Sequence, residues 1–514
     1  MKLTPEEYRR RVEGCWIGKN IGGTLGMPME WNRATNDVSY YTHDISGEPL
    51  PNDDLDIQVL WLLALEDNGL DLDAKVLGRY FNELMIFTHA EYGTAKANLR
   101  VGLEPPYSGI YKNDFKHSCG SFIRSEIWAC LFPGYPALAA KYAFEDAIVD
   151  HGDGEGVYAE VFFAALESAA FFEPDLEKLI EIGQTYIPAD CAVARAIRDG
   201  VDFARRGVSK ETAREYMMQH YIGHIEWHYI APEDERKGYG EGPFGFDVPS
   251  NMFIIAYNLV AGRGDLEKSM CGAVWFGEAT DCTAGTIAAL HGIRCGIDSI
   301  DKKWIEPIGT KIKTISIDPF RMESRIPKDI YEFSDRLAKL HAQAVQKFGL
   351  SAEPPRDFAA PTWFTNIYDD MRVVTYRFDY VNVRLDYMGD PVIRAGEPKR
   401  IRFLISNTAK SVSTERLNLH LYTAEEMQVL PSRELSTLVT MGHMGSGISA
   451  VEFELCIEQA ARPLYRGVLE ITFEDSKRGR IHHVPFVLLN EGGARVPSKF
   501  EKNGPPMCPN QPRV

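Results

Sequence analysis

The chain has 514 residues, of which 45% are hydrophobic and 25% are charged, and its formal net charge at pH 7 is −17. This length exceeds the size at which one hydrophobic core normally stops growing, so we expect two domains. The negative charge argues against nucleic acid or an anionic membrane as the main partner. The sequence has no apolar run of about 18 residues for a membrane span. It also lacks an apolar signal segment, and its nine scattered cysteines contain no Cys-x-x-Cys pair, so we expect a soluble cytoplasmic protein with reduced thiols.

The first predicted helix starts at Thr4, with Pro5 at its first position and Glu7 as the partner of the cap. It continues into a glycine-rich stretch that ends at Glu30. Each glycine inside a helix costs up to about 1 kcal/mol relative to alanine, so the dense glycines need a reason. They indicate either close packing between helices or backbone that lines a ligand cavity with Glu30 at its mouth. These glycines are Gly14, Gly18, Gly22, Gly23 and Gly26.

An acidic helix start follows at Asn52, whose side chain is a plausible N-cap. Asp53, Asp54 and Asp56 fall in the first turn, where the helix dipole favours negative charge, and an apolar run to Leu65 continues the helix. One interpretation is a solvated, well-capped helix start. The other is a site for a hard cation, since Mg²⁺ takes oxygen ligands and often uses one or two carboxylates with waters.

Further polar residues interrupt the helical patterns of the middle of the chain. Residues 118–128 contain Gly120, Ser121 and Arg124, and a predicted helix over 137–148 carries Asp146 and leads to His151. Taken alone, such a histidine is more often structural than catalytic. Residues 224–249 form a polar, glycine-rich loop. These segments alone do not decide between structural and functional roles.

A second acidic helix start lies at Asp281, in front of a helix dominated by small residues that should pack closely against other helices. Beyond residue 350 the pattern changes, because prolines give way to period-2 alternation such as Ile401, Phe403 and Ile405. This alternation predicts a β-sandwich of Ig-like size. We therefore expect an all-α catalytic domain over 1–350, a proline-rich linker over 351–365, a β-sandwich over 366–495 and an extended tail over 496–514.

Taken together, the first 350 residues resemble the ADP-ribosylglycohydrolase family. The glycine-rich helix ending in Glu30 is similar to the N-terminal helix of that family, and residues 120–124 and 146–151 are similar to two further family segments. Residues 52–55 stand where the family has Thr-Asp-Asp-Thr, and residues 279–282 stand where it has Asp-Thr-Asp-Thr.

The resemblance implies an all-α fold that binds two Mg²⁺ ions and cleaves a glycosidic bond at the anomeric carbon of a ribose. By position it implies metal ligation by Asn52, Asp53, Asp54 and Asp281. It makes Glu30 a candidate acid, base or water-positioning residue, with Asp53 and Asp54 in the catalytic group and Asp56 as a compensating carboxylate. The implied substrate-binding residues are Gly120, Ser121, Arg124, Asp146 and His151.

This chain departs from the family pattern at several ligand positions. Asn52 and Leu55 replace threonines, Ala279 replaces an acidic ligand and Cys282 replaces a hydroxyl ligand. We therefore expect one or two ions, with the second position weakened or lost.

The expected substrate is a small-molecule or protein-linked glycoside, either ADP-ribose-like or a sugar, and a homo-oligomer is compatible with the sequence. Two other functions remain open. One is metal-independent glycoside hydrolysis by paired carboxylates such as Glu30 with Asp53 or Asp54. The other is a catalytically inactive protein that binds ADP-ribose or a sugar.

Overall fold

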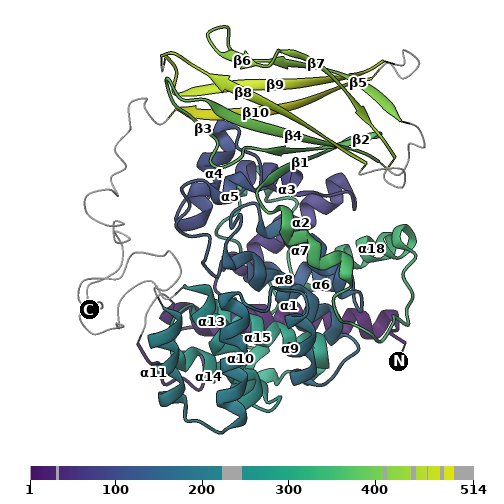
Figure 1. Ribbon diagram of the computed structural model, residues 1–514. Coiled ribbons are helices and arrows are strands. Elements are labelled where there is room, and N and C mark those ends of the chain that lie inside the picture. Colours follow the sequence, from purple (N-terminus) through teal and green to yellow (C-terminus); the bar gives the residue numbers. More distant parts are fainter. Residues whose placement is uncertain are drawn as a thin grey trace. The chain divides into compact units, whose positions relative to one another are not determined.

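The computed structural model describes residues 2–30, 34–222, 246–408, 414–441, 447–459, 461–474 and 480–490. The chain divides into two compact units: a helical unit of Met1–Leu99 and Ser108–Met371, and a sheet unit of Arg100–Tyr107 and the residues from Arg372 onward. A helical region followed by a strand-rich region confirms the predicted fold class (Figure 1). The sequence did not indicate that Arg100–Tyr107 belongs with the strands.

The helices of the described residues all precede the first strand (Figure 1). The α-helices are α1 (Pro5–Gly26), α2 (Asp53–Asn68), α3 (Ala74–Leu84), α4 (Ala90–Val101), α5 (Tyr107–Ile110), α6 (Glu126–Leu131), α7 (Pro136–Ala147), α8 (Glu155–Ala170), α9 (Leu176–Gln184), α10 (Ala192–Arg205), α11 (Lys210–Tyr221), α13 (Val248–Ala261), α14 (Leu266–Phe276), α15 (Thr280–Cys295), α16 (Lys302–Ile305), α17 (Pro319–Met322), α18 (Ile330–Phe348) and α19 (Thr362–Thr365). The 3₁₀ helices are η1 (Met27–Met29), η2 (Phe122–Arg124), η3 (Ile297–Ser299) and η4 (Asn366–Asp370).

Helices α1 and α15 pack backbone against backbone at the centre of the helical unit. A Cβ added at Gly18 would lie 2.2 Å from the carbonyl oxygen of Ala288, and one added at Gly22 would lie 2.3 Å from that of Ala284. No side chain larger than hydrogen fits at either position without separating the helices. Close helix packing therefore explains these glycines. It also brings the C-terminal end of α1 beside the start of α15, since a Cβ at Gly26 would touch Thr280.

Two sheets form the sheet unit, with strand orders β1-β2-β4-β8-β6 and β3-β10-β9-β5-β7, and the neighbouring strands are antiparallel except for β3. Within the second sheet, β3 pairs with β10 in parallel. Rings of Phe403 and Phe486, from different sheets, lie 6.1 Å apart, so the sheets face each other. The strands are β1 (Val373–Arg377), β2 (Val381–Asp386), β3 (Val392–Ile393), β4 (Lys399–Asn407), β5 (Glu415–Tyr422), β6 (Gln428–Leu430), β7 (Glu434–Val439), β8 (Ile448–Cys456), β9 (Leu464–Phe473) and β10 (Ile481–Asn490).

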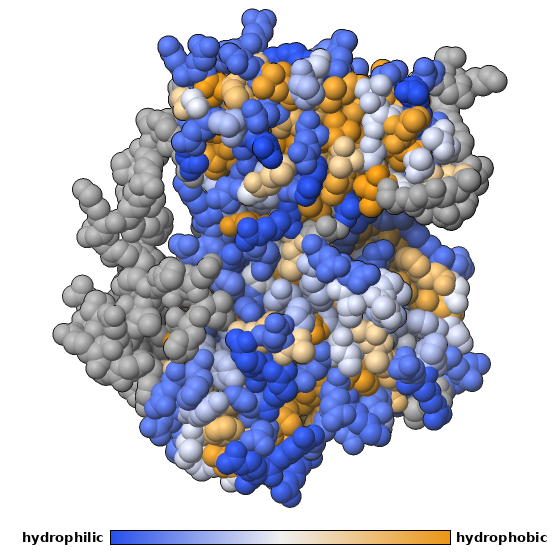
Figure 2. Space-filling model, viewed as in Figure 1, coloured by the Kyte–Doolittle hydropathy of each residue, from blue (hydrophilic) through white to orange (hydrophobic). Residues whose placement is uncertain are grey.

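Alternation in the sequence places one face of each long strand in the core of the sheet unit. In β4, Ile401, Phe403 and Ile405 are fully buried, as the period-2 pattern predicted. Figure 2 shows hydrophobic residues on the surface of the strand region as well. The exposed large apolar side chains there include Tyr422, Leu430, Leu438, Ile448 and Ile481.

Residues 351–371 belong to the helical unit, and this range includes the proline-rich linker that we expected over 351–365. The reason is that Phe358 and Phe364 are buried in the helical core. The hydroxyl of Tyr186 donates to the carbonyl of Phe358 at 3.0 Å and fixes this stretch against the end of α9. The tail over 496–514 and nearly all of the loop over 224–249 lie outside the described residues.

Candidate active site

Two acidic helix starts, far apart in the sequence, meet in the helical unit. Carboxylate oxygens of Asp53 and Asp54, at the start of α2, and of Asp281, at the start of α15, all lie within 4.8 Å of one another. A second cluster with the same limit combines Glu30 and Cys282 with Asp281. Asp281 thus belongs to both clusters. The close packing of α1 with α15 explains how Glu30, just beyond α1, reaches this place.

Asn52 joins the two motifs through both ends of its amide. Its oxygen accepts a hydrogen bond from the backbone N–H of Asp54 at 2.7 Å, which confirms the predicted N-cap. Its nitrogen donates to Oδ2 of Asp281 at 3.2 Å. A Cβ at Gly23 would lie 2.6 Å from that nitrogen, so glycine at this position leaves the space that the Asn52 amide occupies. These contacts give Asn52 a role as a cross-link between the two motifs, and its role as a metal ligand stays a prediction.

Crowding of carboxylates dominates the electrostatics of the site. Burial and the neighbouring charge of Asp53 raise the pKa of Asp281 to about 6. Burial, followed by Asp281 and Asp53, also raises the pKa of Glu30 well above its usual value. Burial raises the pKa of Asp54 in the same way, against the opposing effect of Lys19. Carboxylates packed this closely repel one another when they are ionised, and a divalent cation bound between them would remove that repulsion. These residues therefore fit such an ion.

The site opens at Asp53 and Glu30, which are half-buried, whereas Asp54, Asp281 and Cys282 are buried. The hydroxyl of Tyr92 donates to Oδ2 of Asp53 at 2.9 Å. The exposed ring of His89 lies 5.4 Å from the Tyr92 ring. The buried Tyr92 thus contacts the carboxylate cluster from α4, and the exposed His89 lies beside Tyr92. Single aromatic residues carry little signal in a sequence, and we predicted neither residue.

Lys19 lies on the inner side of the cluster, and we did not predict a role for it. Its Nζ is 2.5 Å from Glu126 and 3.5 Å from Oδ2 of Asp54, and its side chain is 1% exposed. Because both carboxylates are close, the pKa of Lys19 is raised although burial opposes this. The signal that could have found it is a lysine placed between the packing glycines Gly18 and Gly22.

Asp56 points away from the cluster, and the structure gives it a structural role in place of the expected catalytic one. Its Oδ2 accepts hydrogen bonds from the backbone N–H groups of Ile315 and Ser316 at 2.7 and 2.6 Å, and from the Ser316 hydroxyl at 2.9 Å. The side chain is fully buried, and burial raises its pKa to about 7. Asp56 therefore ties the segment that precedes α17 to α2.

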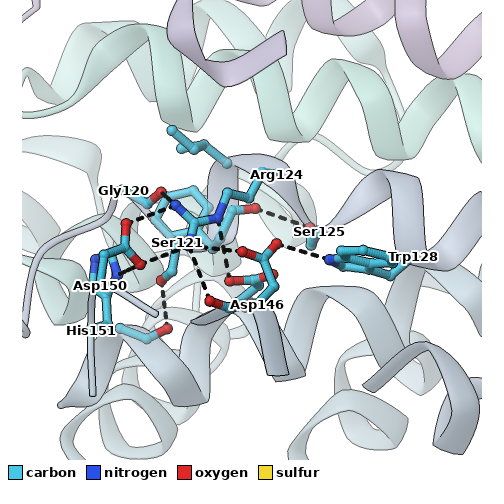
Figure 3. Close-up of polar contacts among 12 residues, drawn as sticks. Gly120, Ser121, Arg124, Ser125, Trp128, Asp146, Asp150 and His151 are labelled. Atoms are coloured by element: carbon cyan, nitrogen blue, oxygen red, sulfur yellow. Dashed lines mark hydrogen bonds and ion pairs between the residues drawn. The ribbon is translucent and has the colours of Figure 1, made fainter. Parts of the chain in front are cut away.

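A buried ion-pair network contains the residues that we expected to bind substrate. Arg124 makes a bidentate contact with Asp150 at 2.7 and 2.9 Å and a further contact with Asp146 at 2.9 Å (Figure 3). Although burial opposes ionisation, Arg124 and His151 hold the pKa of Asp150 below its usual range. Ser121 donates to the carbonyl of Gly156.

These side chains have no exposed surface, and they form a scaffold under the site in place of the expected cleft lining. Gly120 serves the same packing, because a Cβ there would lie 1.9 Å from the Glu91 carboxylate. Of the residues expected to bind substrate, none is exposed in the described part of the chain.

Ser118, His151 and Asp150 are connected in a line similar to a hydrolase triad. The Ser118 hydroxyl lies 3.0 Å from Nε2 of His151, and Nδ1 of His151 lies 2.8 Å from Asp150. All three are at most 1% exposed. A nucleophile needs room for a reacting atom beside it. This line is therefore part of the buried scaffold.

Comparison with known proteins supports the helical unit as the functional one. A search of curated proteins finds no match for this chain. The family model described as ADP-ribosylglycohydrolase matches residues 4–345, which include both acidic helix starts and Glu30. The chain therefore belongs to the ADP-ribosylglycohydrolase family.

Proposed function

We propose that this protein hydrolyses an N- or O-glycosidic bond at a ribose-like sugar with the help of a divalent cation, for which Mg²⁺ is the first candidate. The observation that carries this proposal is the meeting of Asp53, Asp54 and Asp281 within 4.8 Å. Hard carboxylate oxygens are the donors that Mg²⁺ prefers. Family membership supports the glycohydrolase class.

Each residue at the mouth has a definite task in this proposal. Asp53, Asp54 and Asp281 would hold the cation, which would supply charge stabilisation for sugar oxygens and lower the pKa of a water molecule. Glu30 is half-buried, beside the cluster, and burial together with Asp281 raises the pKa of its carboxyl. A carboxylate oxygen of Glu30 lies within 4.8 Å of Asp281 in the second cluster, so Glu30 is placed to take the proton of the attacking water. Tyr92 holds Asp53 in place through the hydrogen bond from its hydroxyl.

The rim of the site favours a substrate with a flat or aromatic part next to the sugar. The rings of Phe87 and His89 lie 4.9 Å apart, and His89 is exposed next to Tyr92. Aromatic faces bind planar groups through stacking and burial. An ADP-ribose-like glycoside, free or attached to a protein, fits this description and the family.

Hydrolysis of ADP-ribosylated and simple glycoside substrates, each with Mg²⁺ and with EDTA, tests the proposal. We expect release of ADP-ribose that requires Mg²⁺, and a loss of kcat/KM of about a hundredfold or more in Asp53→Asn and Asp281→Asn. The control is Asp202→Asn, which alters an exposed aspartate of α10 that pairs with Arg206. Full activity of both site variants would contradict the assignment of the site.

The raised pKa of Glu30 beside Asp53 and Asp54 also favours a second function, the metal-independent hydrolysis of a carbohydrate by paired carboxylates. In that case cleavage of a plain glycoside continues in EDTA. The same assay therefore separates the two functions.

A further inference from the structure

Lys19 is a buried positive charge at the inner end of the candidate metal site. Its Nζ contacts Glu126 at 2.5 Å, Oγ1 of Thr286 at 3.2 Å and Oδ2 of Asp54 at 3.5 Å. Burying an ammonium group is unfavourable unless partners surround it. Here the partners come from α2, α6 and α15, and Lys19 itself comes from α1. The ammonium is thus held at one place by four helices.

The fold provides space and a fixed partner for this lysine. A Cβ added at Gly285 would lie 3.1 Å from Cδ of Lys19 and 3.3 Å from Oδ2 of Asp54, so the glycine on α15 leaves room for both side chains. The amide of Gln58 donates to the other carboxylate oxygen of Glu126 at 2.8 Å. Both ends of the Lys19–Glu126 pair are therefore fixed before any ligand binds.

The two carboxylate oxygens of Asp54 have different neighbours. Oδ2 faces the ammonium, and Oδ1 faces the thiol of Cys282 at 3.7 Å. Only one side of Asp54 is thus directed toward the ligand clusters. The two clusters share Asp281, so ions in both would be close neighbours. Their mutual repulsion would add to the repulsion from the ammonium.

We propose that the ammonium of Lys19 acts as a built-in cation in place of a second metal ion, so that the chain binds a single divalent ion on Asp53, Asp54 and Asp281. This inference rests on the proposed function only in that these aspartates hold a cation. Lys19 is then a positioning residue that neutralises and orients Asp54 from the inner side. The side chain of Ala279, at the start of α15, has no donor atom with which to complete a second site.

Titration of the metal-free, full-length protein with Mn²⁺ tests the number of ions. Isothermal titration calorimetry and the electron paramagnetic resonance signal of free Mn²⁺ count bound ions without relying on activity. We expect one ion per chain. Two ions of comparable affinity would overturn the role of Lys19 and leave the proposed function intact. The absence of any binding would overturn both.

A charge-balanced variant tests whether Lys19 is the reason why only one ion binds. Lys19→Met alone leaves the buried Glu126 without a charged partner and is expected to unfold the protein, so the variant is Lys19→Met combined with Glu126→Gln. The positive charge of Lys19 lies next to Asp54, whereas the negative charge of Glu126 lies behind Lys19, so removal of both charges strengthens the attraction of the site for a cation. We therefore expect Mn²⁺ to bind roughly tenfold more tightly, or a second ion to bind. Thermal unfolding followed by circular dichroism establishes that the variant is folded.

The matched control removes another partly buried lysine–carboxylate pair from the helical unit. Lys116 and Asp153 lie 3.2 Å apart, with side chains 15% and 12% exposed. Lys116→Met combined with Asp153→Asn should leave both the affinity and the number of ions at the wild-type values. Wild-type affinity and a single ion in the Lys19/Glu126 variant as well would overturn the inference.

Discussion

The amide nitrogen of Asn52 donates to Oδ2 of Asp281 at 3.2 Å and joins two acidic motifs that lie 229 residues apart. The same side chain caps α2 through its oxygen. One amide thus sets both the start of a helix and the distance between the carboxylates of the site. Loss of this amide should affect stability and cation binding together.

Asn52→Ala is expected to lower the free energy of unfolding by about 1–2 kcal/mol through the lost cap, and to weaken Mg²⁺ binding as well. Denaturant unfolding and calorimetry measure the two effects. Asp175→Ala is the control, because Asp175 caps α9 through two backbone N–H groups away from the site. The control should show a loss of stability of similar size and wild-type Mg²⁺ affinity. Unchanged Mg²⁺ affinity in Asn52→Ala would show that the link does not position the ligands.

Stability of the metal-free protein should fall as the pH rises through the range in which Asp281 ionises. Its folded-state pKa of about 6 lies above the ordinary aspartate pKa of 3.8, so the unfolded chain releases this proton first. The contribution of Asp281 is thus fully present below about pH 4 and is lost as the pH rises through about 6. Melting temperatures in EDTA and in Mg²⁺ between pH 5 and pH 8 test this. We expect Mg²⁺ to stabilise the protein increasingly over this range, and a constant difference would contradict it.

Much of the fold was accessible from periodicity and local chemistry. The cap at Asn52 and the alternation in β4 each depend on a few neighbouring residues, so the sequence predicts them directly, whereas close packing was one of two interpretations of the glycines of α1. The meeting of the acidic motifs, by contrast, was implied only by the family resemblance. Nothing local indicates that residues 53 and 281 are in contact.

The roles of individual polar residues were harder to predict. Asp56 is three residues from Asp53 and looks equivalent in the sequence, yet it faces the backbone of Ser316. Arg124 looked like a substrate ligand, but three buried carboxylates surround it. Whether a charged side chain faces a cleft or a buried partner depends on distant segments. Tertiary packing therefore determines the direction of the side chain, and local sequence patterns do not predict it.

Arg124→Lys should destabilise the protein severely, and it should do so without a selective effect on substrate binding. Lysine cannot reproduce the bidentate contact with Asp150, and it would leave buried carboxylates without a full partner. Breaking a buried pair costs about 3–5 kcal/mol. Urea unfolding measures this cost.

Arg205→Lys, at an exposed pair with Glu177, should unfold like the wild type and serves as the control. Any folded Arg124→Lys protein should retain the wild-type KM. A raised KM with unchanged stability would instead return Arg124 to the substrate site.

Asp56→Asn separates the structural carboxylate from the candidate ligands on the same helix turn. The amide keeps the shape but accepts less strongly from the N–H groups of Ile315 and Ser316, and one of its faces becomes a donor. We expect a loss of about 1–3 kcal/mol in the free energy of unfolding, with kcat at saturating Mg²⁺ within a few-fold of the wild type. Asp53→Asn, at the mouth of the site, should show the reverse pattern of near-native stability and lost activity. If Asp56→Asn abolished turnover while it remained as stable as the wild type, Asp56 would belong to the catalytic group after all.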